Sequence, residues 1–93
     1  MEDILALRLF LAIADTASFT HAARRLSLTP AVASRKLAAL EAEIGQRLFL
    51  RSTRKVSLTA EGQLFYERSR KILDDLQDAR AMLSHAMQAP RGK

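Results

Sequence analysis

Residues 28–45 read LTPAVASRKLAALEAEIG, and this stretch decides the fold. Apolar residues recur along it in steps of three and four, which predicts a helix with one face buried in a core. Just after its start, the same stretch offers Ser34, Arg35 and Lys36, which a core helix does not need. That end of the helix therefore has a second role, outside the core. The residues of the apolar face are Ala33, Leu37, Leu40 and Ile44.

The ends of this helix are marked by their residue types. Thr29 is suited to cap the start, because its hydroxyl can accept a hydrogen bond from a free backbone N–H. Pro30 then falls at the first helical position, where proline is favoured. Gly45 supplies the left-handed residue that ends many helices. The sequence therefore predicts a helix over residues 30–44.

Two further helices are predicted before it. Residues 4–14 carry an apolar stripe at helical spacing, and a shorter helix follows the break at residues 15–18. Ser18 is the expected N-cap of the shorter helix. Its two alanines are small enough to let another helix approach closely, as a tight helix-turn-helix corner requires. The apolar positions of the shorter helix are Phe19, Ala22, Ala23 and Leu26.

After Gly45, two short apolar runs at 48–50 and 56–58 flank a polar, basic tip. This pattern predicts a small β-hairpin. Thr59 can cap a last helix, and nothing in the sequence breaks that helix before Pro90. At 1.5 Å per residue, roughly 30 residues span about 45 Å, which is too long to be buried on so small a core.

The apolar pattern of the last helix predicts a partner helix. Its steps alternate between three and four, as in a coiled coil, with Ser69 as a polar exception. The alternative is packing on its own domain, which we expect for the first turns around Leu64 and Phe65. The predicted dimerisation residues are Phe65, Ile72, Leu76, Ala79, Leu83 and Ala86.

Composition narrows the functional classes. The 93 residues carry a net charge of +5, and eight basic against two acidic residues lie between Ser18 and Leu58. This bias favours an anion-binding surface over a merely solvated one. There is no cysteine, and His21 and His85 are far apart, so a metal site is not expected. We expect no cofactor. Because no apolar run is long enough to cross a bilayer, we also expect no membrane association and a cytoplasmic location.

The order of elements is that of a mainly α winged helix-turn-helix with a small β-hairpin and a long dimerisation helix. In such folds the second helix of the pair enters the DNA major groove with its N-terminal end. Arg35 can then bind guanine or a phosphate, and Ser34 a phosphate or a base edge. The alternatives are an ion pair of Arg35 with Glu41 or another acidic residue, and simple solvation of Arg24, Arg25 and His21.

The sequence resembles the N-terminal DNA-binding domain and linker helix of LysR-type transcriptional regulators. The similarity runs from Leu7 to Gly62 and is strongest in SFTHAARRL, ASRKLAALEAEIGQRLF and RSTRKVSLT. The resemblance implies a bacterial, sequence-specific regulator that binds double-stranded DNA as a homodimer on a dyad operator. It implies a DNA-binding domain over 1–58, a linker helix over 59–89 and a hinge or tail over 90–93.

Site residues follow from the resemblance and from the helix geometry together. The predicted helix over residues 30–44, called the recognition helix below, and the start of the helix before it would contact phosphates and bases. The basic tip of the hairpin, called the wing, would reach the DNA backbone or the minor groove. The expected DNA-binding residues are Ser18, Thr20, Thr29, Pro30, Ala31, Ser34, Arg35, Ala38, Arg51, Ser52, Thr53 and Arg54.

Family members usually continue into an effector-binding domain, through which many form tetramers. We therefore expect this chain to be part of a longer regulator, with any small-molecule effector bound by the missing domain. The chain departs from the family at Pro30 and Ala31, where many members have Gln-Pro, and has LTAEG where LTxAG is usual. The first departure removes a glutamine base contact and favours readout through apolar contact and DNA shape.

Three other classes compete with this interpretation. A protein-interaction module could use the same fold, although it would not need the basic Arg35, Arg51 and Arg54. Another regulator family with a similar DNA-binding head, such as the molybdate-responsive regulators, is the second alternative. An enzyme is the weakest, because the sequence offers no paired carboxylates in a plausible cleft, no nucleophile with a base and no phosphate-binding glycine loop.

Overall fold

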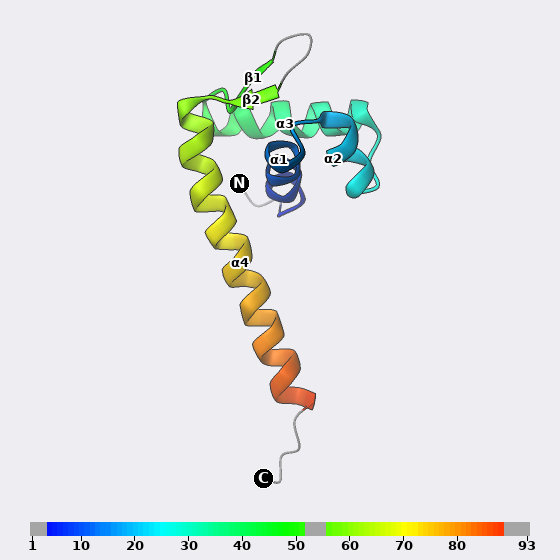
Figure 1. Ribbon diagram of the computed structural model, residues 1–93, viewed down its shortest axis with the longest axis vertical. Helices are drawn as coiled ribbons and strands as arrows, with labels where there is room; N and C mark the ends of the chain where they lie inside the picture. The colour runs from blue at the N-terminus through cyan, green and yellow to red at the C-terminus, as the bar shows by residue number, and fades with distance from the viewer. Residues whose placement is uncertain (1–3, 52–55, 89–93) are drawn as a thin grey trace.

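The computed structural model describes the backbone of residues 4–51 and 56–88, which form four helices and one two-stranded hairpin (Figure 1). The mainly helical fold with a small hairpin and a long final helix is confirmed. In chain order the elements are α1 (Ile4–Thr16), α2 (Phe19–Arg25), α3 (Pro30–Ile44), β1 (Phe49–Arg51), β2 (Val56–Leu58) and α4 (Ala60–Gln88).

Helix α1 is the centre of the core. It packs against α2, α3, α4 and β2, so it is apolar on most sides, and Leu9 and Ile13 are fully buried. Phe10 joins two distant elements, because its ring lies 5.3 Å from the ring of Phe49 and 5.1 Å from that of Phe65. Phe19 in turn packs edge-on against Phe49. The phenylalanines are therefore core residues and not surface stacking platforms.

The predicted starts of α2 and α3 and the predicted end of α3 are confirmed. The Ser18 hydroxyl accepts a hydrogen bond from the His21 N–H at 3.1 Å, and that of Thr29 accepts one from the Val32 N–H at 3.2 Å. Gly45 ends α3 with a φ of 81°, in the left-handed region. Helix α1 runs to Thr16, two residues beyond the predicted end, because the apolar stripe does not include its last turn.

The hairpin strands are antiparallel, and β2 leads almost directly into α4. Phe49 pairs with Leu58, and Leu50 with Ser57. Only Thr59 separates the end of β2 from the start of α4. Figure 1 shows α4 running from the hairpin past α1 and then away from the other helices, which gives the molecule extents of 59 × 25 × 20 Å. In the part of the chain that the structure describes, no helix is apolar and long enough to span a membrane.

Candidate nucleic-acid interface

The first half of α3 presents one face to solvent. Its buried face, Ala33, Leu37 and Leu40, holds the helix on α1 and α2. Helical spacing places the remaining residues of this half on the opposite side of the helix, outside the core. Of the predicted DNA-binding residues, Thr29, Pro30, Ala31, Arg35 and Ala38 are exposed here, and Ser34 is half-buried.

A tight corner fixes this face relative to α2. Ala22 and Ala23 are almost fully buried in α2, which packs against both α1 and α3. The Leu28 N–H donates to the Ala23 carbonyl at 2.8 Å and ties the turn to the preceding helix. Ser27 adopts a φ of 59°, and this left-handed residue reverses the chain within a few positions.

The start of α2 also presents polar groups to solvent. Thr20 and His21 are exposed in the first turn. Ser18 is half-buried, and its hydroxyl oxygen caps the start of α2 by accepting a hydrogen bond from the His21 N–H. This oxygen therefore already has a partner within the chain. It can still donate its hydroxyl hydrogen outward.

The wing is described only in part. Arg51 is the last residue of β1, and its backbone alone is described. Ser52, Thr53 and Arg54 lie outside the described residues. The strands that carry the tip are nevertheless placed firmly, because Leu48 and Phe49 are each only 1% exposed.

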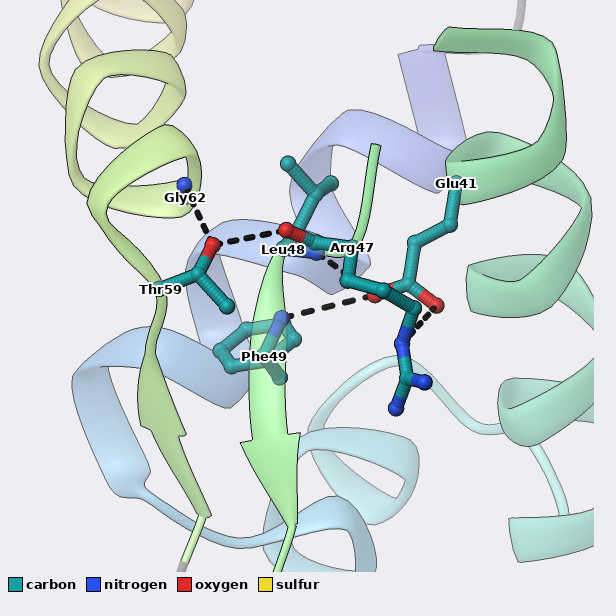
Figure 2. Close-up of polar contacts among 6 residues, drawn as sticks. All are labelled: Glu41, Arg47, Leu48, Phe49, Thr59 and Gly62. Carbon is teal, nitrogen blue, oxygen red and sulfur yellow. Dashed lines mark hydrogen bonds and ion pairs between the residues drawn. The ribbon is translucent and has the colours of Figure 1, made fainter. Parts of the chain in front are cut away.

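Sequence reasoning missed the residue that joins α3 to the hairpin. The Glu41 carboxylate is buried, and its Oε2 accepts a hydrogen bond from the Leu48 N–H at 2.7 Å and a longer one from the Phe49 N–H at 3.4 Å (Figure 2). Its Oε1 lies 3.9 Å from Nε of Arg47. The available signal was the spacing, because Glu41 falls four positions after Leu37 and three before Ile44, on the apolar face.

The alternative ion pair between Arg35 and Glu41 is therefore wrong. Glu41 turns inward and is occupied by the backbone of the following strand. The Arg35 side chain makes no hydrogen bond or ion pair with any other residue that the structure describes, and Arg35 is exposed on the face defined above.

The same junction includes the start of α4. The Thr59 hydroxyl donates to the Arg47 carbonyl at 2.6 Å and accepts from the Gly62 N–H at 2.9 Å, as Figure 2 shows. The Thr59 N–H donates to the Leu48 carbonyl at 3.0 Å. A Cβ on Gly62 would lie 2.0 Å from that carbonyl oxygen, so only glycine permits this approach. The predicted cap at Thr59 is confirmed.

Helix α4 has two apolar faces, and the sequence pattern combines them. Phe65 is half-buried with its ring against that of Phe10, so it packs on its own domain as expected for the first turns, and its part in the dimerisation seam stays a prediction. Leu76 also packs in part against the domain core, and Ser69 and Leu73 face that core in between. The apolar stripe of α4 that faces the core thus continues for about three turns past the first turns of the helix. Packing on the domain is predicted for those first turns alone.

A second stripe on α4 remains exposed. Ile72 is 52% and Leu83 66% exposed, as predicted for residues without a partner in their own domain, and Ala79 is exposed as well. Leu64, for which packing on its own domain is predicted, is instead 67% exposed, and Met82, which lies outside the predicted seam, is 73% exposed. Ala86 lies in the last turns of α4, where the backbone alone is described.

A polar contact fixes α4 against the end of α1. The Tyr66 hydroxyl donates to Asp15 Oδ1 at 2.7 Å, and Arg70 donates to Oδ2 of the same carboxylate. Partial burial raises the pKa of Asp15, but the hydrogen bonds from Tyr66 and Arg70 and the charges of Arg70 and Arg25 outweigh it and hold that pKa below its ordinary value. The hydrogen bonds with Tyr66 and Asp15 raise the pKa of Arg70.

The described residues contain no group of three or more histidine or acidic side chains placed to hold a metal ion. What they do provide is an exposed helix face with a cation, a polar helix start beside it and a hairpin bonded to the same helix. This arrangement can contact a polyanion at several points.

The chain was compared with known proteins. Residues 4–63 match the family described as bacterial regulatory helix-turn-helix protein, lysR family. A helix-turn-helix-type transcriptional regulator of Methanocaldococcus jannaschii is 41% identical over 83 residues, which cover 89% of this chain but only 28% of that relative. The chain therefore spans well under half the length of this relative.

Two solved structures have the same architecture. A complex of the BenM DNA-binding domain with catB site 1 DNA gives a TM-score of 0.89 at 31% identity, covering 96% of this chain and 99% of that one. A complex of the CbnR DNA-binding domain with DNA gives 0.83 at 32% identity, covering 92% and 99%. The matches confirm the predicted family, and with it a regulator rather than an enzyme: the chain belongs to the LysR family of bacterial regulatory helix-turn-helix proteins.

Proposed function

We propose that this chain binds double-stranded DNA sequence-specifically, as a homodimer on a dyad operator, and so regulates transcription. The observation that carries the proposal is the exposed N-terminal face of α3, where Arg35 stands beside Pro30, Ala31 and Ala38. The same arrangement of helices, hairpin and long helix occurs in the BenM domain, whose structure was determined with DNA bound.

Recognition divides between two kinds of contact. Arg35 is the base-reading residue, because a guanidinium can donate two hydrogen bonds to guanine in the major groove. The helix starts at Ser18, Thr20 and Thr29 would bind phosphates, which set the register without reading sequence. The residues from Arg51 to Arg54 in the wing would contact the DNA backbone or the minor groove, and their positive charges would neutralise further phosphates.

Dimerisation is proposed through the exposed stripe of α4. Isolated exposed leucines are ordinary, but here Leu64, Ile72, Met82 and Leu83 share one helix whose outer half touches no other part of the described domain. An antiparallel partner helix would cover them and set the spacing of the two reading heads. For the whole regulator we further propose an effector-binding domain, the formation of tetramers and a cytoplasmic location.

The test is a selection of bound sequences from a randomised DNA pool with the purified chain, followed by affinity measurements against salt. The proposal expects an enriched dyad and a steep fall of affinity with salt, because phosphate contacts release counterions. No enrichment, with weak binding that is independent of salt, would contradict it and would favour the protein-interaction module.

A further inference from the structure

The junction around Glu41 couples the two elements that would contact DNA. Glu41 belongs to the last turn of α3, and the N–H groups that it accepts from belong to the residues that begin the hairpin. The connection from α3 to β1 is only four residues long, so the helix and the strand are also close neighbours along the chain. The carboxylate thus bonds the recognition helix directly to the start of the hairpin.

The chemistry of the site requires a carboxylate. Two N–H donors of the strand and the Arg47 guanidinium converge on Glu41, and all three only donate hydrogen bonds. An ionised carboxylate only accepts, through two oxygens, whereas a glutamine amide would turn an NH2 donor toward one of these donors. Because the side chain of Glu41 is only 9% exposed, water cannot readily substitute for a lost acceptor.

The opposite edge of the hairpin is held as well. Thr59 bonds to Arg47 and Leu48 from the α4 side, while Glu41 bonds to Leu48 from the α3 side. Leu48 therefore has its N–H fixed by α3 and its carbonyl fixed by the start of α4. The backbone N–H and carbonyl of this one residue therefore set where the strand lies between α3 and α4.

We propose that Glu41 is a positioning residue for DNA recognition, which sets the orientation of the hairpin relative to the recognition helix so that both engage one duplex together. The inference rests on the proposed function and extends it to a residue that touches no DNA. Without this bond the α3 face remains intact, because Ala33, Leu37 and Leu40 still hold it on the core, whereas the hairpin loses its hydrogen bonds to α3 and is held only by the core and from the α4 side.

The test compares Glu41→Gln with two controls, using the dyad recovered from the randomised pool as the DNA. Glu43→Gln makes the same charge change on the exposed side of the same helix turn. Ile13→Val removes one methyl from the core away from the junction and controls for lost stability. Hydroxyl-radical footprints separate the backbone protected beside the α3 contacts from that protected by the hairpin.

The proposal expects Glu41→Gln alone to lose the hairpin protection while the α3 protection persists. Its affinity should fall about tenfold, and its salt slope should become shallower by about 0.9 for each phosphate that the hairpin no longer neutralises. The Leu48 amide should exchange with solvent about tenfold faster in this variant, as expected for one lost bond to a charged acceptor. A folded Glu41→Gln with unchanged hairpin protection and salt slope would overturn the proposal.

Two further results keep the outcomes distinct. If Glu41→Gln does not fold, Glu41→Asp keeps the charge but shortens the reach by one methylene, and it must show the same selective loss of hairpin protection; unchanged protection would overturn the proposal. If the wild-type chain selects no dyad, the proposed function fails, whereas a wild-type dyad with no effect of the variant defeats only the role of Glu41.

Discussion

The hydroxyl of Tyr66 donates a hydrogen bond to Oδ1 of Asp15 at 2.7 Å, across 51 positions of sequence. Arg70, one turn after Tyr66, pairs with the other oxygen of the same carboxylate. These bonds join the inner half of α4 to the last turn of α1, while Thr59 joins the start of α4 to the hairpin. The inner half of α4 is therefore fixed at two polar points as well as by its apolar stripe.

Asp15→Asn should lower the free energy of unfolding by about 1 kcal/mol at neutral pH, a modest value because Arg70 and Asp15 side chains are 38% and 34% exposed. The pKa of Asp15 lies below its ordinary value of 3.8 in the folded protein, so the stabilisation is present above that value and is lost as the pH falls through the folded pKa. Urea unfolding of both proteins from about pH 7 to about pH 3 checks this. A difference that does not shrink below pH 3.8 would contradict the assignment.

Gly62→Ala should destabilise the protein by about 3 kcal/mol, because the new Cβ would clash with a backbone carbonyl that cannot rotate away. Gly45→Ala is the matched control. Its Cβ meets no atom within 4 Å, so the only cost is that of its left-handed φ, about 1 kcal/mol. Urea unfolding of the two variants gives the comparison, and equal losses would mean that the contact between Gly62 and Leu48 is not tight.

Ser69→Ala should stabilise the protein by about 1 kcal/mol. Ser69 is 0% exposed, and its Oγ has no hydrogen-bond partner among the described residues, so the hydroxyl is buried without compensation. Alanine also has the higher helix propensity. Thermal unfolding of variant and wild type measures the difference. A loss of stability would show that the hydroxyl has a partner in solution.

Leu83→Lys should weaken dimerisation at least about tenfold, because each dimer would bury two charges in place of two leucine side chains. Leu83 is 66% exposed in the monomer, so its replacement should leave the unfolding of the domain itself unchanged. Gln77→Lys adds the same charge at another exposed position of α4 and serves as the control. Sedimentation equilibrium measures both, and an intact Leu83→Lys dimer would contradict the proposed seam.

Arg35→Ala should cost about 1–3 kcal/mol in specific DNA binding and relax the preference for one base pair. Its non-specific binding should change much less, since one phosphate neighbour at most is lost. Arg80→Ala, an exposed arginine on the outer half of α4, is the control. Titrations on the selected dyad and on an unrelated duplex separate the two effects. Equal losses on both duplexes would assign Arg35 to the DNA backbone.

The fold could be predicted from the sequence because its local signals agree with its packing. Thr29, Pro30 and Gly45 specify the ends of α3 through the chemistry of single residues, and those ends are where the structure has them. The predicted end of α1 falls too early, since Thr16 is held by a side-chain bond to the Ala12 carbonyl that leaves no apolar signal.

The contacts between distant elements could not be predicted in the same way. On α4 a coiled-coil spacing fits both the stripe that faces α1 and the one that faces solvent, so the spacing alone does not show that Phe65 packs against Phe10. Ser69 interrupts the predicted seam because it faces the domain core instead. The role of Glu41 has no signature among the side chains, because the partners of its carboxylate in the strand are backbone groups.

The single residue between β2 and α4 has a mechanical consequence. Thr59 is bonded on both sides, to the start of β1 and to the first turn of α4, and leaves no slack between them. A tilt of the first turn of α4 would therefore move the hairpin with it, because a single bonded residue separates the two elements.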